Sequence, residues 1–312
     1  METVAVVLCT YNGETYLENQ IDSILNQNRV LVEIFVRDDG STDRTLEILK
    51  HYANYYSNFH LMNNGNTCNK GIKKGFMEAL NWAVSYSDDI LYFAFSDQDD
   101  VWLPNKLIRG IEKIRKSTNK NGALYYSNKT VVDENLKVKY EEKLTGHNDF
   151  SDFYFVSCAY GCTMIINRKM AVLSSQTCSS ASHFHDDWIH RLAISLESDI
   201  IFDDNSYILY RQHGDNVCGS FATEDKPLWY LIKRAFEYIL KGKGYERATL
   251  AMDIMNNYSH LMSEEIKENM KLIAEYKKSP QNKLQLLRKA DISGRPAKER
   301  WIWKVKVLLG YF

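Results

Sequence analysis

Short apolar runs alternate with segments whose apolar positions recur at helical spacing over roughly the first 120 residues. The run Ile90 to Phe95 is apolar throughout, which favours a strand covered on both faces. Leu17, Ile21 and Ile24 recur at the i, i+4, i+7 spacing of an amphipathic helix. Strands are predicted at 4–8, 32–36, 59–62 and 90–95. Strands that alternate with helices predict an α/β fold with a doubly wound, mainly parallel sheet.

The alternation becomes irregular after residue 121. A helix is expected to begin near residue 184, with Trp188, Ile189 and Leu192 turned inward. A polar stretch near 133–149 fits a loop on the acceptor side of a site and a plain solvated loop equally well. The expected strands here are 123–127, 162–166, 200–202 and 207–209, the last two as a pair.

Strand signals end near residue 220, and helical segments are expected at 229–240 and 245–278. We therefore predict an α/β domain over residues 1–220 and a helical extension over 221–312. The final segment combines Trp301 and Trp303 with many basic residues, as in amphipathic elements on anionic membranes. A C-terminal helix docked on its own domain explains the same pattern equally well.

The bulk composition is that of an ordinary globular protein, with 45% hydrophobic and 25% charged residues among 312. A formal net charge of −1 provides no global field for nucleic acid, so none is expected as a partner. The six cysteines include no CxxC pair, which favours buried thiols in a reducing compartment. No signal peptide or apolar stretch of about 20 residues is visible, so we expect a cytoplasmic protein.

An acidic loop follows the apolar run that ends at Phe95. It carries Asp97, Asp99 and Asp100, and burying three like charges is costly unless a cation lies among them. Carboxylate oxygens are ligands that Mg²⁺ and Mn²⁺ prefer, and ligands of open α/β sheets bind at the carboxyl ends of strands. A solvated acidic turn that caps the next helix is the alternative.

Other polar residues follow the predicted strands, without a GxGxxG or P-loop motif. Thr10, Asn12 and Asp39 are candidates to hold a nucleotide, although such residues also serve routinely in turns and caps. Asp186 and Asp187 lie in a first helical turn, where the helix dipole alone favours carboxylates. Zinc is disfavoured because no histidine or cysteine lies at finger spacing.

Five motifs in collinear order resemble the family 2 glycosyltransferases, and most closely the bacterial rhamnosyltransferases of surface-polysaccharide assembly. The resemblance covers about residues 1–220 and implies a GT-A fold. It also implies an inverting sugar transfer from a nucleoside-diphosphate donor. The motifs are Thr10-Tyr-Asn-Gly13, Arg37-Asp-Asp-Gly-Ser-Thr-Asp43, Ser96-Asp-Gln-Asp-Asp-Val-Trp102, His185-Asp186 and Tyr210-Arg-Gln-His213.

The resemblance implies roles for individual residues. Asp97 and Asp99 match the family's DXD element, and His213 matches a histidine that can complete the metal and diphosphate site. Asp186 matches the general base, although the following Asp187 departs from the usual aromatic residue and leaves the base open between the two. The positions implied to hold the donor nucleotide are Thr10, Tyr11, Asn12, Asp39, which addresses the base, Lys73 and Asp97.

The expected reaction is transfer of rhamnose from dTDP-rhamnose to a polysaccharide or a lipid-linked oligosaccharide, with Mg²⁺ or Mn²⁺ on the diphosphate. A carboxylate on the acceptor side would take the proton of the attacking hydroxyl. The same reaction with a UDP-hexose, a nucleotidyltransferase and a non-catalytic scaffold of a polysaccharide assembly complex are the alternatives. The enzyme is expected in the cytoplasm or peripherally on the cytoplasmic membrane face, bound through its C-terminal tail.

Overall fold

The computed structural model divides the chain into two compact units. One comprises residues 1–148, 157–178 and 184–213, and the other comprises 149–156, 179–183 and 214–312. The residues that the structure describes are 1–65, 68–144, 146, 150–155, 157, 159–177, 184–214, 247–291 and 296–310. Each unit is described here by itself.

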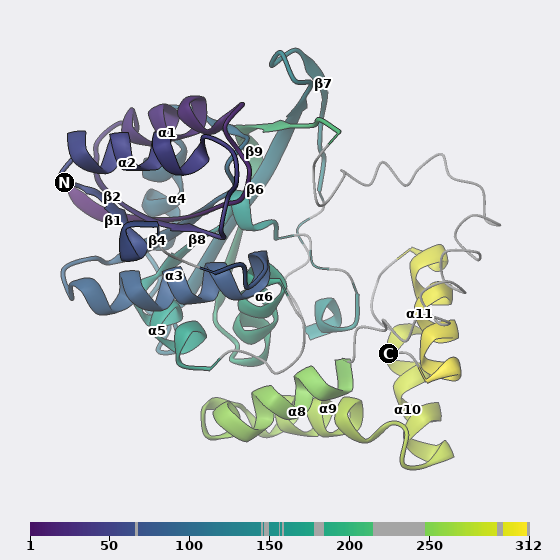
Figure 1. Cartoon of the computed structure of the whole chain (residues 1–312). Coiled ribbons are helices and arrows are strands. Elements are labelled where there is room, and N and C mark those ends of the chain that lie inside the picture. Colours follow the sequence, from purple (N-terminus) through teal and green to yellow (C-terminus); the bar gives the residue numbers. More distant parts are fainter. Residues whose placement is uncertain are drawn as a thin grey trace. The chain divides into compact units, whose positions relative to one another are not determined.

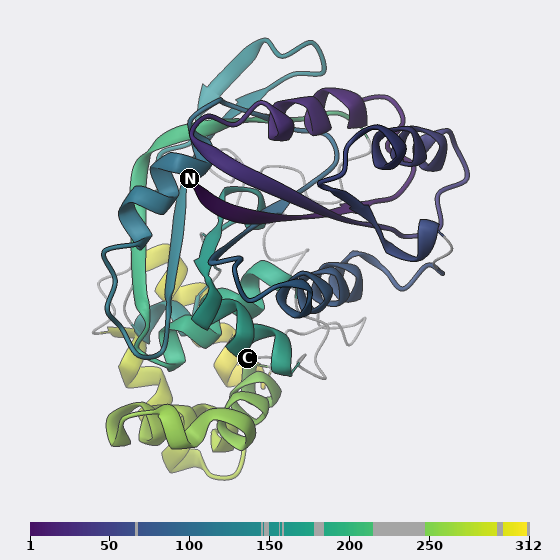
Figure 2. The same cartoon turned by 90° about the vertical axis from the view of Figure 1, so that its left-hand side faces the viewer.

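The first unit is built on one sheet of order β3-β2-β1-β4-β8-β6-β9-β5, with β7 paired to β6. The pairs β3–β2, β2–β1, β1–β4 and β6–β9 are parallel. The sheet is strongly twisted from one end to the other (Figure 2). The strands are β1 Glu2–Thr10, β2 Val30–Asp38, β3 Phe59–Leu61, β4 Tyr92–Ser96, β5 Val101–Trp102, β6 Ala123–Val132, β7 Val138–Glu141, β8 Ile165–Asn167 and β9 Asp199–Arg211.

Helices cover both faces of this sheet (Figure 1). Val4, Val6 and Leu8 alternate onto one face, where they share a core with α1 Leu17–Leu25, α2 Thr45–Tyr55 and α4 Lys106–Ile114. On the other face, Phe95 meets Phe76 at 6.3 Å between ring centroids. The helices on that face are α3 Ile72–Tyr86, α5 Arg168–Gln176 and α6 His185–Ser195. The predicted doubly wound α/β fold is confirmed.

Several predicted elements differ in detail from the structure. The predicted strand 162–166 begins only at Ile165, because the 3₁₀ turn η3 Gly161–Thr163 precedes it. The expected strand pair at 200–202 and 207–209 is wrong, since β9 runs through both segments as one irregular strand. The polar stretch near 133–149 contains β7, which pairs with β6.

The second unit is helical over its longest described segments. The prediction of one helix over 245–278 is wrong, because the 3₁₀ turn η5 Ser259–Leu261 separates two helices. The hydroxyl of Ser263 caps the second of them. The expected helix at 229–240 and the boundary at 220 lie outside the described residues. Among the described helices, none combines the length and apolar character needed to cross a bilayer. The helices are α8 Arg247–Tyr258, α9 Glu264–Glu275, α10 Pro280–Asp291 and α11 Ala297–Leu309.

Gly122 precedes β6 in a backbone conformation that only glycine adopts easily, with φ of +88°. A Cβ there would lie 2.6 Å from the backbone nitrogen of Met170. We expect Gly122→Ala to lower the free energy of unfolding by about 2–4 kcal/mol, from strain and overpacking together. Gly71→Ala is the control for backbone strain alone, because Gly71 has a φ of +79° with open space around it and should lose less, about 1–2 kcal/mol. Equal losses in urea titrations would contradict the close contact.

Candidate active site

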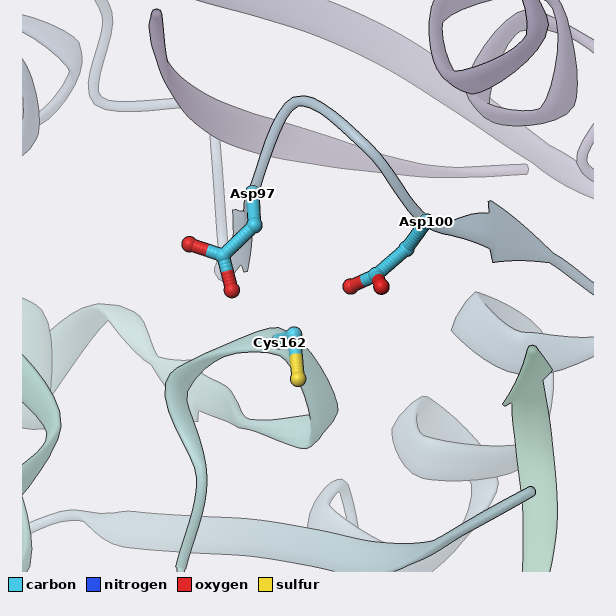
Figure 3. A group of neighbouring side chains, drawn as sticks. All are labelled: Asp97, Asp100 and Cys162. Carbon is cyan, nitrogen blue, oxygen red and sulfur yellow. The ribbon is translucent and has the colours of Figure 1, made fainter. Parts of the chain in front are cut away.

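The acidic loop joins β4 to β5 and holds Asp97 near its start and Asp100 at its end (Figure 3). The side chain of Asp100 is fully buried. Its Oδ1 accepts a hydrogen bond from the backbone N–H of Arg211 at 3.0 Å, whereas its Oδ2 has no hydrogen-bond partner among the residues that the structure describes. A buried carboxylate oxygen without a donor is costly, so this atom is a natural ligand position for a cation.

Two carboxyl groups of the loop, those of Asp97 and Asp100, have a raised pKa. Burial raises the pKa of Asp97 to about 7, and the negative charges of Asp99 and Asp186 add to the shift. Burial likewise raises the pKa of Asp100 well above its ordinary value, with contributions from Asp99 and Asp97. Desolvation and like charges both favour the protonated form, and a cation would reverse this preference.

Lys129 supplies one positive charge beside the loop, and the sequence did not reveal it. The side chain is 2% exposed, with Nζ 3.5 Å from the ring centroid of Tyr160 and 4.1 Å from that of Tyr210. Its charge lowers the pKa of both Asp97 and Asp100. Val131 and Val132 follow Lys129 in the sequence after a single threonine. This pattern could have indicated that the strand continues through Lys129 to Val132.

Lys106 is a second buried lysine near this cluster. Its Nζ lies 3.8 Å from the ring centroid of Trp102 and has no hydrogen-bond partner. Burial lowers the pKa of Lys106 to about 8, and the charge of Asp100 opposes this shift. Two buried lysines, one from β6 and one from α4, therefore interact electrostatically with the acidic loop.

The end of β9 brings His213 to the acidic loop, as the sequence predicted. The His213 Nε2 and Asp99 Oδ2 atoms are 2.9 Å apart. Arg211 donates a hydrogen bond from Nε to the backbone oxygen of Asp99 at 2.8 Å. Tyr16 packs against both, with its ring centroid 4.9 Å from that of His213 and 4.3 Å from the guanidinium carbon of Arg211. Tyr16 was not among the predicted site residues.

These donors fit a hard divalent cation. Ligand atoms of Asp97, Asp100 and Cys162 lie within 4.8 Å of one another (Figure 3). Burial raises the pKa of the Cys162 thiol well above its ordinary value, so sulfur is a poor ligand here. The remaining oxygen donors, with Asp99 and the imidazole of His213 nearby, suit Mg²⁺ or Mn²⁺.

The segment after β1 is held against both the acidic loop and the segment after β2. Tyr11 donates its N–H to Gln98 Oε1 at 2.8 Å and accepts a hydrogen bond from Gln98 Nε2 at 3.0 Å. Asn12, with a φ of 48°, accepts a hydrogen bond on Oδ1 from the N–H of Thr42 at 2.8 Å. Thr10 donates from its hydroxyl to Asp38 Oδ1 at 2.9 Å. The predicted nucleotide residues at positions 10–12 therefore carry structural hydrogen bonds.

Asp39 accepts several hydrogen bonds just after the end of β2. Its Oδ1 accepts hydrogen bonds from Arg37 Nη1 at 2.5 Å and from the N–H of Lys70 at 2.8 Å. Its Oδ2 accepts from the N–H of Gly71 at 2.9 Å, next to the start of α3. Lys73, in the first turn of that helix, places its Nζ 4.6 Å from the ring centroid of Phe184. Arg37 belongs to a quoted motif, but its pairing with Asp39 was not predicted.

Asp186 and Asp187 are adjacent in the first turn of α6 but have different partners. Asp186 Oδ2 accepts a hydrogen bond from the N–H of Gly161 at 3.1 Å. Burial raises the pKa of Asp186 to about 6, and the charge of Asp187 adds to the shift. Asp187 Oδ1 instead pairs with Nη2 of the buried Arg191 at 2.8 Å. Asp186 therefore retains base character near neutral pH, while Asp187 is engaged in an ion pair.

His185 precedes these carboxylates and is buried. Its ring stacks on Phe76 with centroids 3.9 Å apart, and neither ring nitrogen has a hydrogen-bond partner. Burial lowers the pKa of His185 to about 3, so the imidazole is neutral near neutral pH. This packing fixes the start of α6 against α3.

Open α/β sheets bind their ligands at the carboxyl ends of their strands, and the acidic loop follows the carboxyl end of β4. The family model described as "Glycosyl transferase family 2" matches residues 5–172, more than half of the chain. The chain belongs to glycosyl transferase family 2 and is a glycosyltransferase.

Curated relatives agree with this family. The chain is 29% identical over 240 residues to dTDP-rhamnosyl transferase RfbG of Shigella flexneri, covering 72% of this chain and 80% of the relative. It is 28% identical over 171 residues to UDP-Glc:alpha-D-GlcNAc-diphosphoundecaprenol beta-1,3-glucosyltransferase WfgD of Escherichia coli, covering 54% and 61%.

Solved structures share the fold. Residues 1–349 of TarS from S. aureus align with a TM-score of 0.52 and 17% identity, covering 98% of this chain and 80% of that one. The complex of the same protein with UDP-GlcNAc gives a TM-score of 0.51 at 16% identity, covering 99% and 80%. These likenesses and the sheet described above identify the predicted GT-A fold.

Replacing Lys129 by methionine should destabilise the first unit, because the acidic loop would keep its carboxylates and lose a buried cation. We expect the free energy of unfolding to fall by about 3 kcal/mol in Lys129→Met. Lys50→Met, at an exposed position of α2, should change it by less than about 0.5 kcal/mol. Guanidinium titrations at neutral pH measure both values, and equal stability of the two variants would refute the compensating role of Lys129.

Proposed function

We propose that this glycosyltransferase moves a sugar, with inversion, from a nucleoside-diphosphate donor to a glycan or lipid-linked acceptor. The observation that carries the proposal is the placement of a partly buried, weakly acidic Asp186 within electrostatic reach of Asp97. Inversion requires a base on the acceptor side and charge compensation on the side of the leaving diphosphate. Asp186 and the acidic loop provide candidates for these two roles.

Asp186 is the proposed base. Its carboxylate accepts a hydrogen bond from the N–H of Gly161, which fixes its orientation at the start of α6. The acceptor hydroxyl would transfer its proton to this carboxylate as its oxygen attacks the anomeric carbon. Asp187 is a weaker candidate, because its carboxylate is already paired with Arg191 at 2.8 Å.

Asp97, Asp99 and His213 are proposed to hold a divalent cation, with Asp100 supplying a further oxygen. When bound, a Mg²⁺ or Mn²⁺ ion would neutralise charge on the departing diphosphate. Asp99 and His213 are already in contact at 2.9 Å, so the imidazole lies beside the acidic loop without any rearrangement. Lys129 contributes a fixed positive charge to the same region.

Thr10, Tyr11, Asn12, Asp39 and Lys73 are proposed to bind the nucleotide. Their segments follow β1 and β2 or begin α3, and backbone N–H groups tie them together by donating hydrogen bonds to the side-chain oxygens of Asn12 and Asp39. Asp39 already accepts three hydrogen bonds, so any contact with the base would use its remaining acceptor capacity. The network would hold the nucleotide walls rigid before the donor arrives.

The donor is proposed to be dTDP-rhamnose, in line with the name of the Shigella relative. The Escherichia relative is named for a UDP-glucose donor and a diphosphoundecaprenol-linked acceptor, which supports the UDP-hexose alternative and a lipid-linked acceptor. Pocket contacts that distinguish two sugars are worth only a few kcal/mol, so the shared fold is compatible with either donor.

A panel of nucleotide sugars incubated with the purified protein and Mn²⁺ tests the donor. We expect dTDP-rhamnose to be hydrolysed faster than UDP-glucose and UDP-GlcNAc, with activity lost in EDTA and restored by Mn²⁺. Release of the nucleoside diphosphate is the readout. Turnover of UDP-hexoses without dTDP-rhamnose would overturn the rhamnose assignment, and full activity in EDTA would remove the cation from the mechanism.

Single exchanges to asparagine test the base. Asp186→Asn should lower kcat by about 10²–10⁴-fold, because no carboxylate would remain at this position to take the proton of the attacking hydroxyl. Asp187→Asn should cost less and act partly through stability, since it breaks the pair with Arg191. Because the pKa of Asp186 is near 6, kcat/KM should rise with pH through about 6 and then level off. Equal losses in both variants, or an unchanged pH profile in Asp186→Asn, would contradict the assignment.

A further inference from the structure

Helix α11 is docked on its own unit through one face. Trp303 is 3% exposed and Val307 is fully buried. The Trp303 ring lies 5.4 Å from the ring of Tyr154 and 6.2 Å from that of Phe155, measured between centroids. Apolar packing therefore holds this face of the helix against its own unit.

The opposite face of α11 is apolar and exposed. Trp301 and Leu308 lie seven residues apart, which places them on one side of the helix, with Val305 between them. Trp301 is 53% exposed, Leu308 is 56% exposed and Leu309 is 52% exposed. Trp303 follows Trp301 by two residues and so lies roughly on the other side. A contiguous exposed apolar patch of this kind marks an interaction surface.

Helix α10 extends this surface. Lys283 donates a hydrogen bond from Nζ to the backbone oxygen of Leu308 at 3.3 Å, so the start of α10 lies at the end of α11. The neighbouring Leu284 is 51% exposed. The two helices lie side by side in the second unit (Figure 1). We define the amphipathic surface as Leu284, Trp301, Val305, Leu308 and Leu309 together with the basic residues of α10 and α11.

Positive charge is concentrated in this part of the chain. Residues 280–310 contain eight basic residues against two acidic ones, although the whole chain has a formal net charge of −1. The acidic residues of the segment are Asp291 and Glu299, and the basic residues are Lys283, Arg288, Lys289, Arg295, Lys298, Arg300, Lys304 and Lys306. The remainder of the chain is therefore negative and would be repelled by an anionic surface.

We propose that the amphipathic surface is a docking site for an anionic lipid bilayer, with α11 lying flat in the interface. Tryptophan and leucine enter the headgroup boundary, while lysine and arginine are attracted to anionic lipids. A protein partner would need no such excess of one charge. A lipid-linked acceptor would lie in the same bilayer, so docking would bring the enzyme to its acceptor. The purpose of the docking site therefore rests on the proposed function.

Vesicle flotation with the full chain tests this site. We expect binding to phosphatidylcholine vesicles that contain about 30% phosphatidylglycerol, little binding to phosphatidylcholine alone, and release in about 0.5 M NaCl. Trp301→Ser and Leu308→Ser should each weaken binding by about tenfold or more. Leu31→Ser is the matched control, because Leu31 is also 50% exposed but lies on β2. Its binding should equal that of the wild type.

A charge reversal separates the electrostatic contribution. Lys298→Glu should weaken binding to the anionic vesicles roughly tenfold. It places an acidic residue in the first turn of α11, where the helix dipole favours it, so loss of the helix cannot explain the result. Lys50→Glu, at an exposed position of α2, should have a much smaller effect. Equal effects of the two reversals would overturn the proposed site.

Two further outcomes would also overturn it. Binding to neutral and anionic vesicles alike would remove the role of charge. A wild-type dimer that dissociates in Trp301→Ser, measured by sedimentation without lipid, would assign the surface to contact between copies. Donor hydrolysis in the absence of vesicles is measured in parallel, so that failure of the sugar-transfer proposal and failure of membrane docking give different results.

Discussion

Three carboxylates in one short loop impose the main electrostatic constraint on the glycosyltransferase unit. Burial drives Asp97 and Asp100 toward their neutral forms, and the charges of neighbouring carboxylates add to this effect, so the surrounding structure must supply positive charge and hydrogen-bond donors. Lys129 on β6 provides the charge, and the backbone of Arg211 on β9 provides a donor. The second half of the sheet is therefore part of the site rather than a support for it.

Two adjacent carboxylates on α6 illustrate how environment divides chemical roles. Asp187 pairs with Arg191 one helical turn away. Asp186 accepts a hydrogen bond from the N–H of Gly161, and desolvation raises its pKa to about 6. The packing of His185 on Phe76 fixes the first turn of the helix that positions both. The i, i+4 spacing on α6 thus gives Asp187 an arginine partner and leaves Asp186 as the candidate base.

Much of the fold and part of the site could be predicted, because their signals are local. Apolar periodicity located the strands and helices, and the acidic residues after β4 are consecutive or nearly so. The approach of Lys129 to Asp97 depends on the register of β6, β8 and β4, which no local pattern encodes. The two-residue strand β5 exists only through its pairing with β9. By contrast, the pairing of Asp187 with Arg191 was readable from their i, i+4 spacing.

The contact between Gln98 and Tyr11 has a consequence for altering donor preference. Gln98 binds the backbone of Tyr11 through one donated and one accepted hydrogen bond. The side-chain amide of Gln98 thus connects the acidic loop to the loop after β1 by hydrogen bonds. The half-exposed phenol of Tyr11 is not used in these two bonds. Variants at position 11 can therefore change the surface offered to a sugar nucleotide while the hydrogen bonds between the two loops remain. Variants at position 98 would remove those hydrogen bonds.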